Sequence, residues 1–204
     1  MLTILYKNLK YVIINKYLKM LKNAPRGWKV NAEKKICSNK FIELYEDTLD
    51  LKGQKKIYIR GIRRDYSTVV PFISKDKILI IKSYRHLVDS IQLEVPSGYI
   101  DEGETPKEAA IRELREETGY TAKDMISIGH YTLDYSMFEQ KGNLFIAYGM
   151  TKEGHQCLGI MEKIDIEIIT IKEIKHLLFE GKILNAASIV ALYRALHFHE
   201  HQIN

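Results

Sequence analysis

The sequence predicts an α/β (α+β) protein in which a mixed β-sheet lies between helices, with an N-terminal antiparallel strand layer before it. Three observations predict this class. Strand-like segments with alternating or wholly apolar patterns run from residue 40 to residue 81. A strongly signalled helix begins after Thr105, and further strand-like segments are followed by two helix signals near the C-terminus. The 204 residues show no internal repeat or low-complexity tract, so one domain with an accessory layer is expected.

The positive charge of the chain is concentrated at its N-terminus. Residues 1–35 hold nine Lys or Arg and one acid, a net charge of +8, whereas the whole chain carries +5. The remainder therefore carries −3, and we expect no nucleic-acid partner. With only two cysteines the chain lacks a disulfide framework, which favours a cytoplasmic setting.

Residues 1–36 are interpreted as a basic N-terminal extension that we predict to be helical. A helix packed on the domain or on a second subunit, a disordered or non-native extension, and an anchor or targeting segment are the alternatives. Contact of this segment with a membrane surface therefore stays open. No apolar stretch approaches the roughly 18 residues needed to cross a bilayer, so no transmembrane segment is expected.

Residues 37–66 are predicted to form the N-terminal antiparallel strand layer. Residues 41–45 and 56–60 alternate between apolar and polar side chains, with a turn at 52–54. Small layers of this kind leave strand edges that need cover, and we therefore expect a homodimer.

The main domain is predicted to span residues 67–198, with residues 199–204 as a tail. Two apolar runs around a polar turn predict a core hairpin over residues 69–81, and three later segments are of strand type: 126–132, 143–149 and 164–171. A capping box at 170–173 predicts a short helix that ends at Gly181, and a last helix is expected from near Asn185 to His197. The histidines at 197, 199 and 201 are interpreted as a solvated terminal segment.

The central helix has both ends marked in the sequence. Thr105 and Glu108 form a capping box, Pro106 suits the first helical position, and Gly119 suits the left-handed position after the last turn. At about 100° per residue, one arc of this helix collects Ala110, Ile111, Leu114 and Thr118. The opposite arc collects Glu113, Glu116 and Glu117, with Arg112 beside them.

The acidic arc is a candidate metal site. Glu113 and Glu117 are like charges at i,i+4, which destabilises a helix by a few tenths of a kcal/mol. Glu116 and Glu117 also lie in the last turn, where the helix dipole disfavours anions by about 0.3–1 kcal/mol each. A bound cation would offset this repulsion; a solvated face of good helix formers is the alternative. Ligands that are all oxygen suit Mg²⁺ or Mn²⁺ rather than Zn²⁺.

The spacing of these residues resembles a known motif. It runs Gly98-x5-Glu104-x7-Arg112-Glu113-Leu114-x-Glu116-Glu117-x-Gly119-Tyr120. This pattern is similar to the Nudix box at every defined position, which implies the Nudix fold and a hydrolase of nucleoside diphosphates linked to another group. The resemblance implies that the metal ligands are Glu113, Glu116, Glu117 and the backbone carbonyl of Ser97. It also implies that Gly98, Glu104 and Arg112 hold the loop and the ligands in place.

The segments that flank the box resemble one branch of this family. Residues 83–85 (Ser-Tyr-Arg) and 93–98 (Leu-Glu-Val-Pro-Ser-Gly) look like the ADP-ribose pyrophosphatase branch, with Ser97 in place of that branch's alanine. Arg85 is then expected to contact a substrate phosphate, because a guanidinium matches phosphate oxygens. Glu94 is expected to reach the terminal ribose or a metal-bound water. The alternatives are that Arg85 is a surface arginine and that Glu94 is a structural hydrogen-bond acceptor.

The loop 134–141 is expected to lie over the metals. It contains a single glutamate, Glu139, which is our candidate catalytic base. Tyr135 stands where the ADP-ribose branch usually has proline, and a tyrosine near this position is reminiscent of the dinucleoside polyphosphate branch. The two interpretations are that Tyr135 stacks on an adenine and that Tyr135 is an aromatic facing the core.

The leading hypothesis is Mg²⁺-dependent hydrolysis of ADP-ribose, a small-molecule nucleoside diphosphate, to AMP and ribose 5-phosphate. Another nucleoside diphosphate sugar or a dinucleoside polyphosphate is the alternative substrate. A non-catalytic sensor of ADP-ribose or NAD is a third interpretation, and the intact box carboxylates argue against it.

Overall fold

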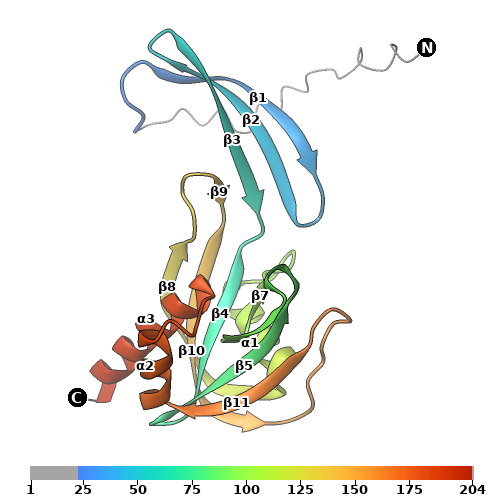
Figure 1. The fold of residues 1–204 in the computed structure, drawn as a ribbon, viewed down its shortest axis with the longest axis vertical. Helices are drawn as coiled ribbons and strands as arrows, with labels where there is room; N and C mark the ends of the chain where they lie inside the picture. The colour runs from blue at the N-terminus through green and yellow to red at the C-terminus, as the bar shows by residue number, and fades with distance from the viewer. Residues whose placement is uncertain (1–22, 204) are drawn as a thin grey trace. The chain divides into compact units, whose positions relative to one another are not determined.

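The computed structural model describes residues 23–203, and these residues form two compact units (Figure 1). Of the described residues, the first unit holds 23–63 together with 134–139, and the second holds 64–133 together with 140–203. Most of the predicted basic extension, residues 1–22, lies outside the described residues.

The first unit is a four-stranded sheet in the order β1-β2-β3-β9. β1 (Trp28–Ser38), β2 (Ile42–Leu51) and β3 (Gln54–Arg63) pair antiparallel, and the short β9 (Phe138–Glu139) pairs parallel with β3. The strands predicted at 41–45 and 56–60 are confirmed within β2 and β3, except that β2 begins at Ile42.

β1 corrects one prediction. We expected helix through residue 36, but residues 28–36 are strand. The reason is tertiary: β1 pairs with β2 along its length, from Trp28 opposite Leu51 to Ser38 opposite Glu43. A cross-strand ion pair, Lys35 Nζ to Glu43 Oε1 at 2.7 Å, adds to this ladder.

The second unit is built on a sheet with the path β11-β5-β4-β10-β8, to which β6 adds beside β5 and β7 beside β4. β4 and β10 are parallel and the remaining pairs are antiparallel, so the predicted mixed sheet is confirmed. The strands are β4 (Tyr66–Ser74), β5 (Lys77–Arg85), β6 (Ser90–Glu94), β7 (Ser97–Tyr99), β8 (Tyr120–Thr132), β10 (Lys141–Lys152) and β11 (Ile164–Thr170). A 3₁₀ turn, η1 (His86–Val88), joins β5 to β6.

Helices cover both faces of this sheet. Val69 of β4 and Phe145 of β10 pack with Ala110 and Leu114 of α1 (Pro106–Thr118). The adjacent residues on the same strands face the other way. They form the larger core cluster with side chains of α2 (Ile171–Phe179) and α3 (Ala186–Ile203), including Val70, Phe72, Leu144, Ile146, Ile174, Leu192 and Leu196. Period-two alternation in buried strands thus produces the expected layers.

Both predicted capping boxes are present. Thr105 and Glu108 exchange side-chain and backbone hydrogen bonds at the start of α1, and Thr170 and Glu173 do the same at α2. Gly119 ends α1 with φ of 72°, the left-handed conformation predicted for it.

The C-terminal tail predicted at 199–204 is a second correction, because α3 continues to Ile203. His199 is 7% exposed and stacks on Phe72 with ring centroids 4.2 Å apart. Its Nδ1 lies 2.9 Å from the Tyr148 hydroxyl, and its Nε2 lies 2.9 Å from the backbone oxygen of Lys75. His199 therefore belongs to the core, since its position on the helix continues the buried face.

Within residues 23–203, no helix is both long and apolar enough to cross a membrane.

Candidate active site

The candidate site begins at the loop that joins β7 to α1. β7 pairs with β4, and the Ser67 hydroxyl of β4 donates to the backbone oxygen of Pro106 at 2.7 Å. The intervening loop is closed by Glu104, whose Oε2 accepts from the Asp101 amide at 2.9 Å. These bonds place the start of α1 against the sheet, so that the residues of the box lie on a rigid support.

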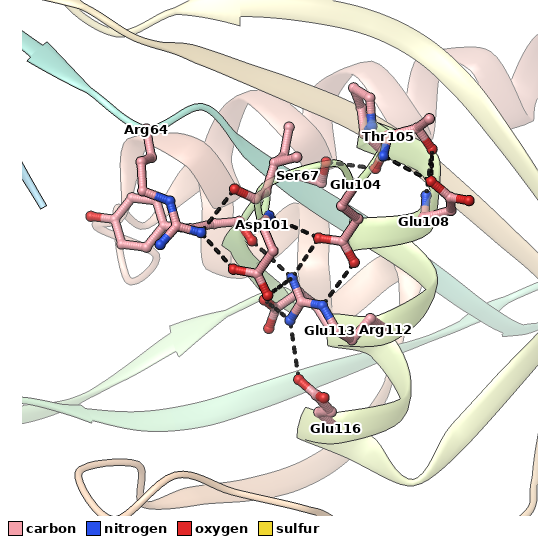
Figure 2. A network of polar contacts seen from close by, with 12 residues as sticks. Arg64, Ser67, Asp101, Glu104, Thr105, Glu108, Arg112, Glu113 and Glu116 are labelled. Carbon is pink, nitrogen blue, oxygen red and sulfur yellow. Dashed lines mark hydrogen bonds and ion pairs between the residues drawn. The ribbon is translucent and has the colours of Figure 1, made fainter. Parts of the chain in front are cut away.

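Arg112 is the centre of a network of carboxylates (Figure 2). Its guanidinium donates to both oxygens of Glu104, at 2.8 and 2.9 Å, and to the backbone oxygen of Tyr99 at 2.8 Å. One terminal nitrogen also donates to Glu113 at 2.6 Å and to Glu116 at 3.1 Å. The hydrogen bonds to Glu104 raise the pKa of Arg112 further above its usual range, and Arg112 in turn lowers the pKa of Glu104. Arg112 therefore holds the loop and two predicted metal ligands together.

Gly98 is required by the position of Glu113. A Cβ at residue 98 would lie 1.9 Å from Oε1 of Glu113, closer than any side chain tolerates. The first glycine of the box thus leaves room for the carboxylate that the helix presents.

Glu117 is a buried carboxylate in the last turn of α1, with 5% of its surface exposed. It accepts a hydrogen bond from the Ser97 amide at 2.9 Å. Burial first, and then the charges of Glu113 and Glu162, raise the pKa of Glu117 well above its ordinary value. Burial also raises the pKa of Glu113, although Arg112 acts in the opposite direction. The fold thus keeps two acids where their ionised forms are disfavoured.

The arcs predicted for α1 are partly corrected. Ala110, Leu114 and Thr118 are buried as expected, but Ile111 is 44% exposed while the acidic Glu117 is buried. The acidic arc is therefore half enclosed by β7 and its neighbours, which a solvated face of helix formers would not be.

The donor set fits a hard divalent cation. All the candidate ligands are oxygen atoms, and a cation would relieve the burial penalty at Glu117 and Glu113. Among residues 23–203, no three acidic, histidine or cysteine side chains converge on one point. The hydrogen bonds of these carboxylates explain why they do not converge. Glu113 and Glu116 accept from Arg112, whereas Glu117 accepts from the Ser97 amide.

Arg85 and Glu94 form a pair at the ends of β5 and β6. Arg85 Nε donates to Oε1 of Glu94 at 2.8 Å, and a terminal nitrogen of Arg85 donates to Oε2. Glu94 is 2% exposed, whereas the Arg85 side chain is 45% exposed. The hydrogen bond to Glu94, with smaller contributions from Glu117 and Glu162, raises the pKa of Arg85. Glu94 thus holds an exposed guanidinium near the acidic helix.

The sequence analysis missed Glu162. The loop that carries it, residues 153–163, is tied to the C-terminal end of α1. The Gln156 side-chain amide donates to the backbone oxygens of Glu117 at 2.7 Å and Ile164 at 3.1 Å, and the Cys157 amide donates to the backbone oxygen of Glu116 at 2.8 Å. The charge of Glu162 then acts on Glu113, Glu117 and Arg85. Its position just before the last strand was the available signal, but the loop has no periodic pattern.

Tyr135 and Glu139 belong to the first unit, so the site in the second unit is described without them. Glu139 is exposed and lies 3.6 Å from the Arg60 guanidinium. Tyr135 is 86% exposed, which corrects the interpretation of a core-facing aromatic.

Comparison with known proteins gives a consistent result. Residues 63–162 match the family model of the NUDIX domain. The chain is 26% identical over 166 residues to the ADP-ribose pyrophosphatase of Bacillus subtilis (strain 168), covering 80% of this chain and 90% of that relative. It is 31% identical over 112 residues to ADP compounds hydrolase NudE of Escherichia coli (strain K12), covering 52% and 60%.

A solved crystal structure of an ADP compounds hydrolase matches this fold with a TM-score of 0.77. The two chains are 22% identical, and the match covers 88% of this chain and 97% of the other. At this identity the likeness shows a shared fold, and the fold class predicted from the sequence is confirmed.

Proposed function

Because the chain carries a NUDIX domain and belongs to the Nudix family, we propose that it hydrolyses the pyrophosphate bond of ADP-ribose, to AMP and ribose 5-phosphate, or of a related nucleoside diphosphate sugar. The observation that carries this proposal is the buried Glu117 beside Glu113, with the Arg85 guanidinium held nearby by Glu94. The names of the two relatives support the substrate class.

We propose Mg²⁺ as the cofactor, with Mn²⁺ as a substitute. Glu113, Glu116, Glu117 and the backbone carbonyl of Ser97 would hold it. When bound, such a cation neutralises phosphate charge and makes a bound water more acidic. Arg112 and Glu104 would keep the ligands oriented through the bonds already described.

The remaining side chains have separable roles in this proposal. Arg85 binds a phosphate oxygen, because Glu94 fixes its orientation through two hydrogen bonds. A water oxygen attacks one phosphorus, and the bond from that phosphorus to the bridging oxygen breaks. The leaving phosphate has a second pKa of about 6 and needs little protonation. The proton of the attacking water must therefore pass to a base.

We propose Glu162 as that base, ahead of Glu139. Glu162 lies in the same unit as Glu113 and Glu117 and acts electrostatically on both. Glu139 belongs to the first unit, where it pairs with Arg60. Loss of a general base costs roughly 10²-fold or more in rate.

The first test replaces Glu117 with Gln and compares ADP-ribose, other nucleoside diphosphate sugars and diadenosine compounds, with Mg²⁺. We expect turnover to fall roughly 10²- to 10³-fold, because several kcal/mol of charge stabilisation are lost. Glu180→Gln, an exposed residue beyond α2, is the matched control. Near-normal turnover by Glu117→Gln would refute the proposed mechanism, and a preference of the native chain for diadenosine compounds would refute the substrate alone.

The second test compares Glu162→Gln with Glu139→Gln in the same assay. We expect the larger fall in kcat for Glu162→Gln, with little change in the concentration of Mg²⁺ needed for half-maximal rate. A larger fall in kcat for Glu139→Gln than for Glu162→Gln would make Glu139 the base instead.

We also propose a homodimer formed through the first unit. Large apolar side chains are exposed on its strands, including Trp28, Ile36, Ile57, Tyr58 and Ile59. Among the described residues, the 11-residue β1 lies at the edge of this sheet, with β2 as its neighbour on one side. The exposed free thiols of Cys37 and Cys157 support a reducing, cytoplasmic setting.

A further inference from the structure

α3 carries two exposed histidines one helical turn apart. His197 and His201 lie on the solvent side of the helix, whereas Ala195, Leu196 and His199 are buried. The two imidazole rings approach each other, with centroids 4.2 Å apart and planes inclined by 45°. This pair lies on the helix layer opposite α1, on the other face of the sheet from the box.

The hydrogen bond of His201 identifies the nitrogen that is available. Nδ1 of His201 lies 2.8 Å from the backbone oxygen of His197. A carbonyl oxygen can only accept, so Nδ1 carries the hydrogen, and Nε2 of the neutral ring carries the lone pair. A backbone carbonyl that fixes the tautomer in this way is a usual support of metal-binding histidines.

A negative charge lies beside the pair. Glu200, next to His201 in the chain, accepts a hydrogen bond from Lys175 of α2 at 2.5 Å. This ion pair links the last turns of α3 to α2 beside the two rings.

We propose that His197 and His201 form a two-histidine chelate for a divalent transition metal such as Ni²⁺, Cu²⁺ or Zn²⁺, completed by water. Histidines at i,i+4 on one helix face form the paired ligands of known zinc sites, with metal–nitrogen distances of about 2.0–2.1 Å. Ring centroids 4.2 Å apart are close enough for one metal ion to contact both rings. Since no third acidic, histidine or cysteine side chain in the described residues joins them, the site is bidentate.

Imidazole ligands distinguish this site from the proposed Mg²⁺ site. Nitrogen donors select Ni²⁺, Cu²⁺ and Zn²⁺, whereas carboxylates and carbonyls suit Mg²⁺. Saturating Mg²⁺ should therefore leave the chelate free for a transition metal, and binding there does not depend on the hydrolase activity.

The test is calorimetric titration of NiCl₂ into the full-length chain with Mg²⁺ in excess, together with the EPR spectrum of added Cu²⁺. We expect Ni²⁺ to bind and Cu²⁺ to show two nitrogen ligands. His197→Gln and His201→Gln should each weaken Ni²⁺ binding at least about tenfold, since even residues that only support a metal ligand contribute this much. His176→Gln, an exposed histidine of α2 outside this pair, is the matched control.

Circular dichroism of the two variants checks that α3 is intact, which Gln, a good helix former, should preserve. Ni²⁺ binding that is absent in the native chain, or equally strong in His197→Gln and His201→Gln, would overturn the chelate. A Cu²⁺ spectrum with a single nitrogen would do the same.

Discussion

At the scale of single residues, the proposed catalytic site carries a stability cost. Glu117 is enclosed by the end of α1 and by β7, and one hydrogen bond from Ser97 compensates its charge only in part. At position 98, the absence of a side chain leaves room for the Glu113 carboxylate. Steric room and burial therefore place the Glu113 and Glu117 carboxyl groups, and the proposed cation would supply the missing compensation.

This cost predicts how Glu117→Gln affects the metal-free protein. The pKa of Glu117 is higher in the fold than its ordinary value of 4.5, so ionisation disfavours the fold as pH rises above that value. Gln resembles the neutral acid and can still accept from Ser97. We therefore expect Glu117→Gln to raise the Tm at pH 8 in EDTA and to leave it nearly unchanged at pH 4. A Tm at pH 8 equal to or below that of the native chain would contradict the burial argument.

At the scale of elements, the site depends on a contact between a helix end and an irregular loop. Four donors of residues 153–157 satisfy backbone oxygens at the end of α1. The Glu153 and Gly154 amides donate to Gly119, the Gln156 side chain donates to Glu117, and the Cys157 amide donates to Glu116. These oxygens have no partner within a helix. The loop thus caps the helix that carries the proposed metal ligands, and it brings Glu162 with it.

Gln156→Leu tests this coupling. The change leaves the backbone oxygens of Glu117 and Ile164 without their side-chain donor, which costs about 1–3 kcal/mol when such groups stay buried. We expect a lower Tm and a fall in kcat, with a smaller change in KM for ADP-ribose, because the proposed base, Glu162, is displaced more than Arg85, the residue proposed to bind phosphate. Gln54→Leu, at an exposed position of β3, is the control. An unchanged kcat would show that the loop holds Glu162 without Gln156.

At the scale of the whole molecule, the two units differ in how they bury apolar surface. The second unit encloses its core between α1 on one face of the sheet and α2 with α3 on the other. The strands of the first unit keep large apolar side chains exposed, Ile57 at 59% and Trp28 at 42% among them. A sheet with this surface is typical of an interface, which is why we propose the dimer there.

Ile57→Lys tests the dimer. A charge in an apolar interface is strongly unfavourable, so we expect sedimentation equilibrium to give the monomer mass of 23.7 kDa for this variant and twice that mass for the native chain. Ile168→Lys, at a 43% exposed position of β11 in the second unit, should stay dimeric. A native chain that sediments as a monomer would remove the proposal.

The sequence by itself determined the features that depend on local chemistry. Capping residues at Thr105 and Thr170, a glycine at position 119 and the apolar runs of β4 and β5 each lie within a few neighbouring residues. The spacing of the Nudix box, on which the family resemblance rests, also lies within one short segment. These features were predicted because neighbours along the chain determine them.

Tertiary structure alone decided the rest. Residues 28–36 became strand because β2 offered a partner, and His199 entered the core because Phe72, Tyr148 and Lys75 converge on it. Glu162 acts on α1 because a loop with no periodic pattern folds back on the helix end, and Arg85 is oriented by Glu94 on the adjacent strand. Each outcome depends on contacts between residues far apart in the chain, and local patterns carry no information about such contacts.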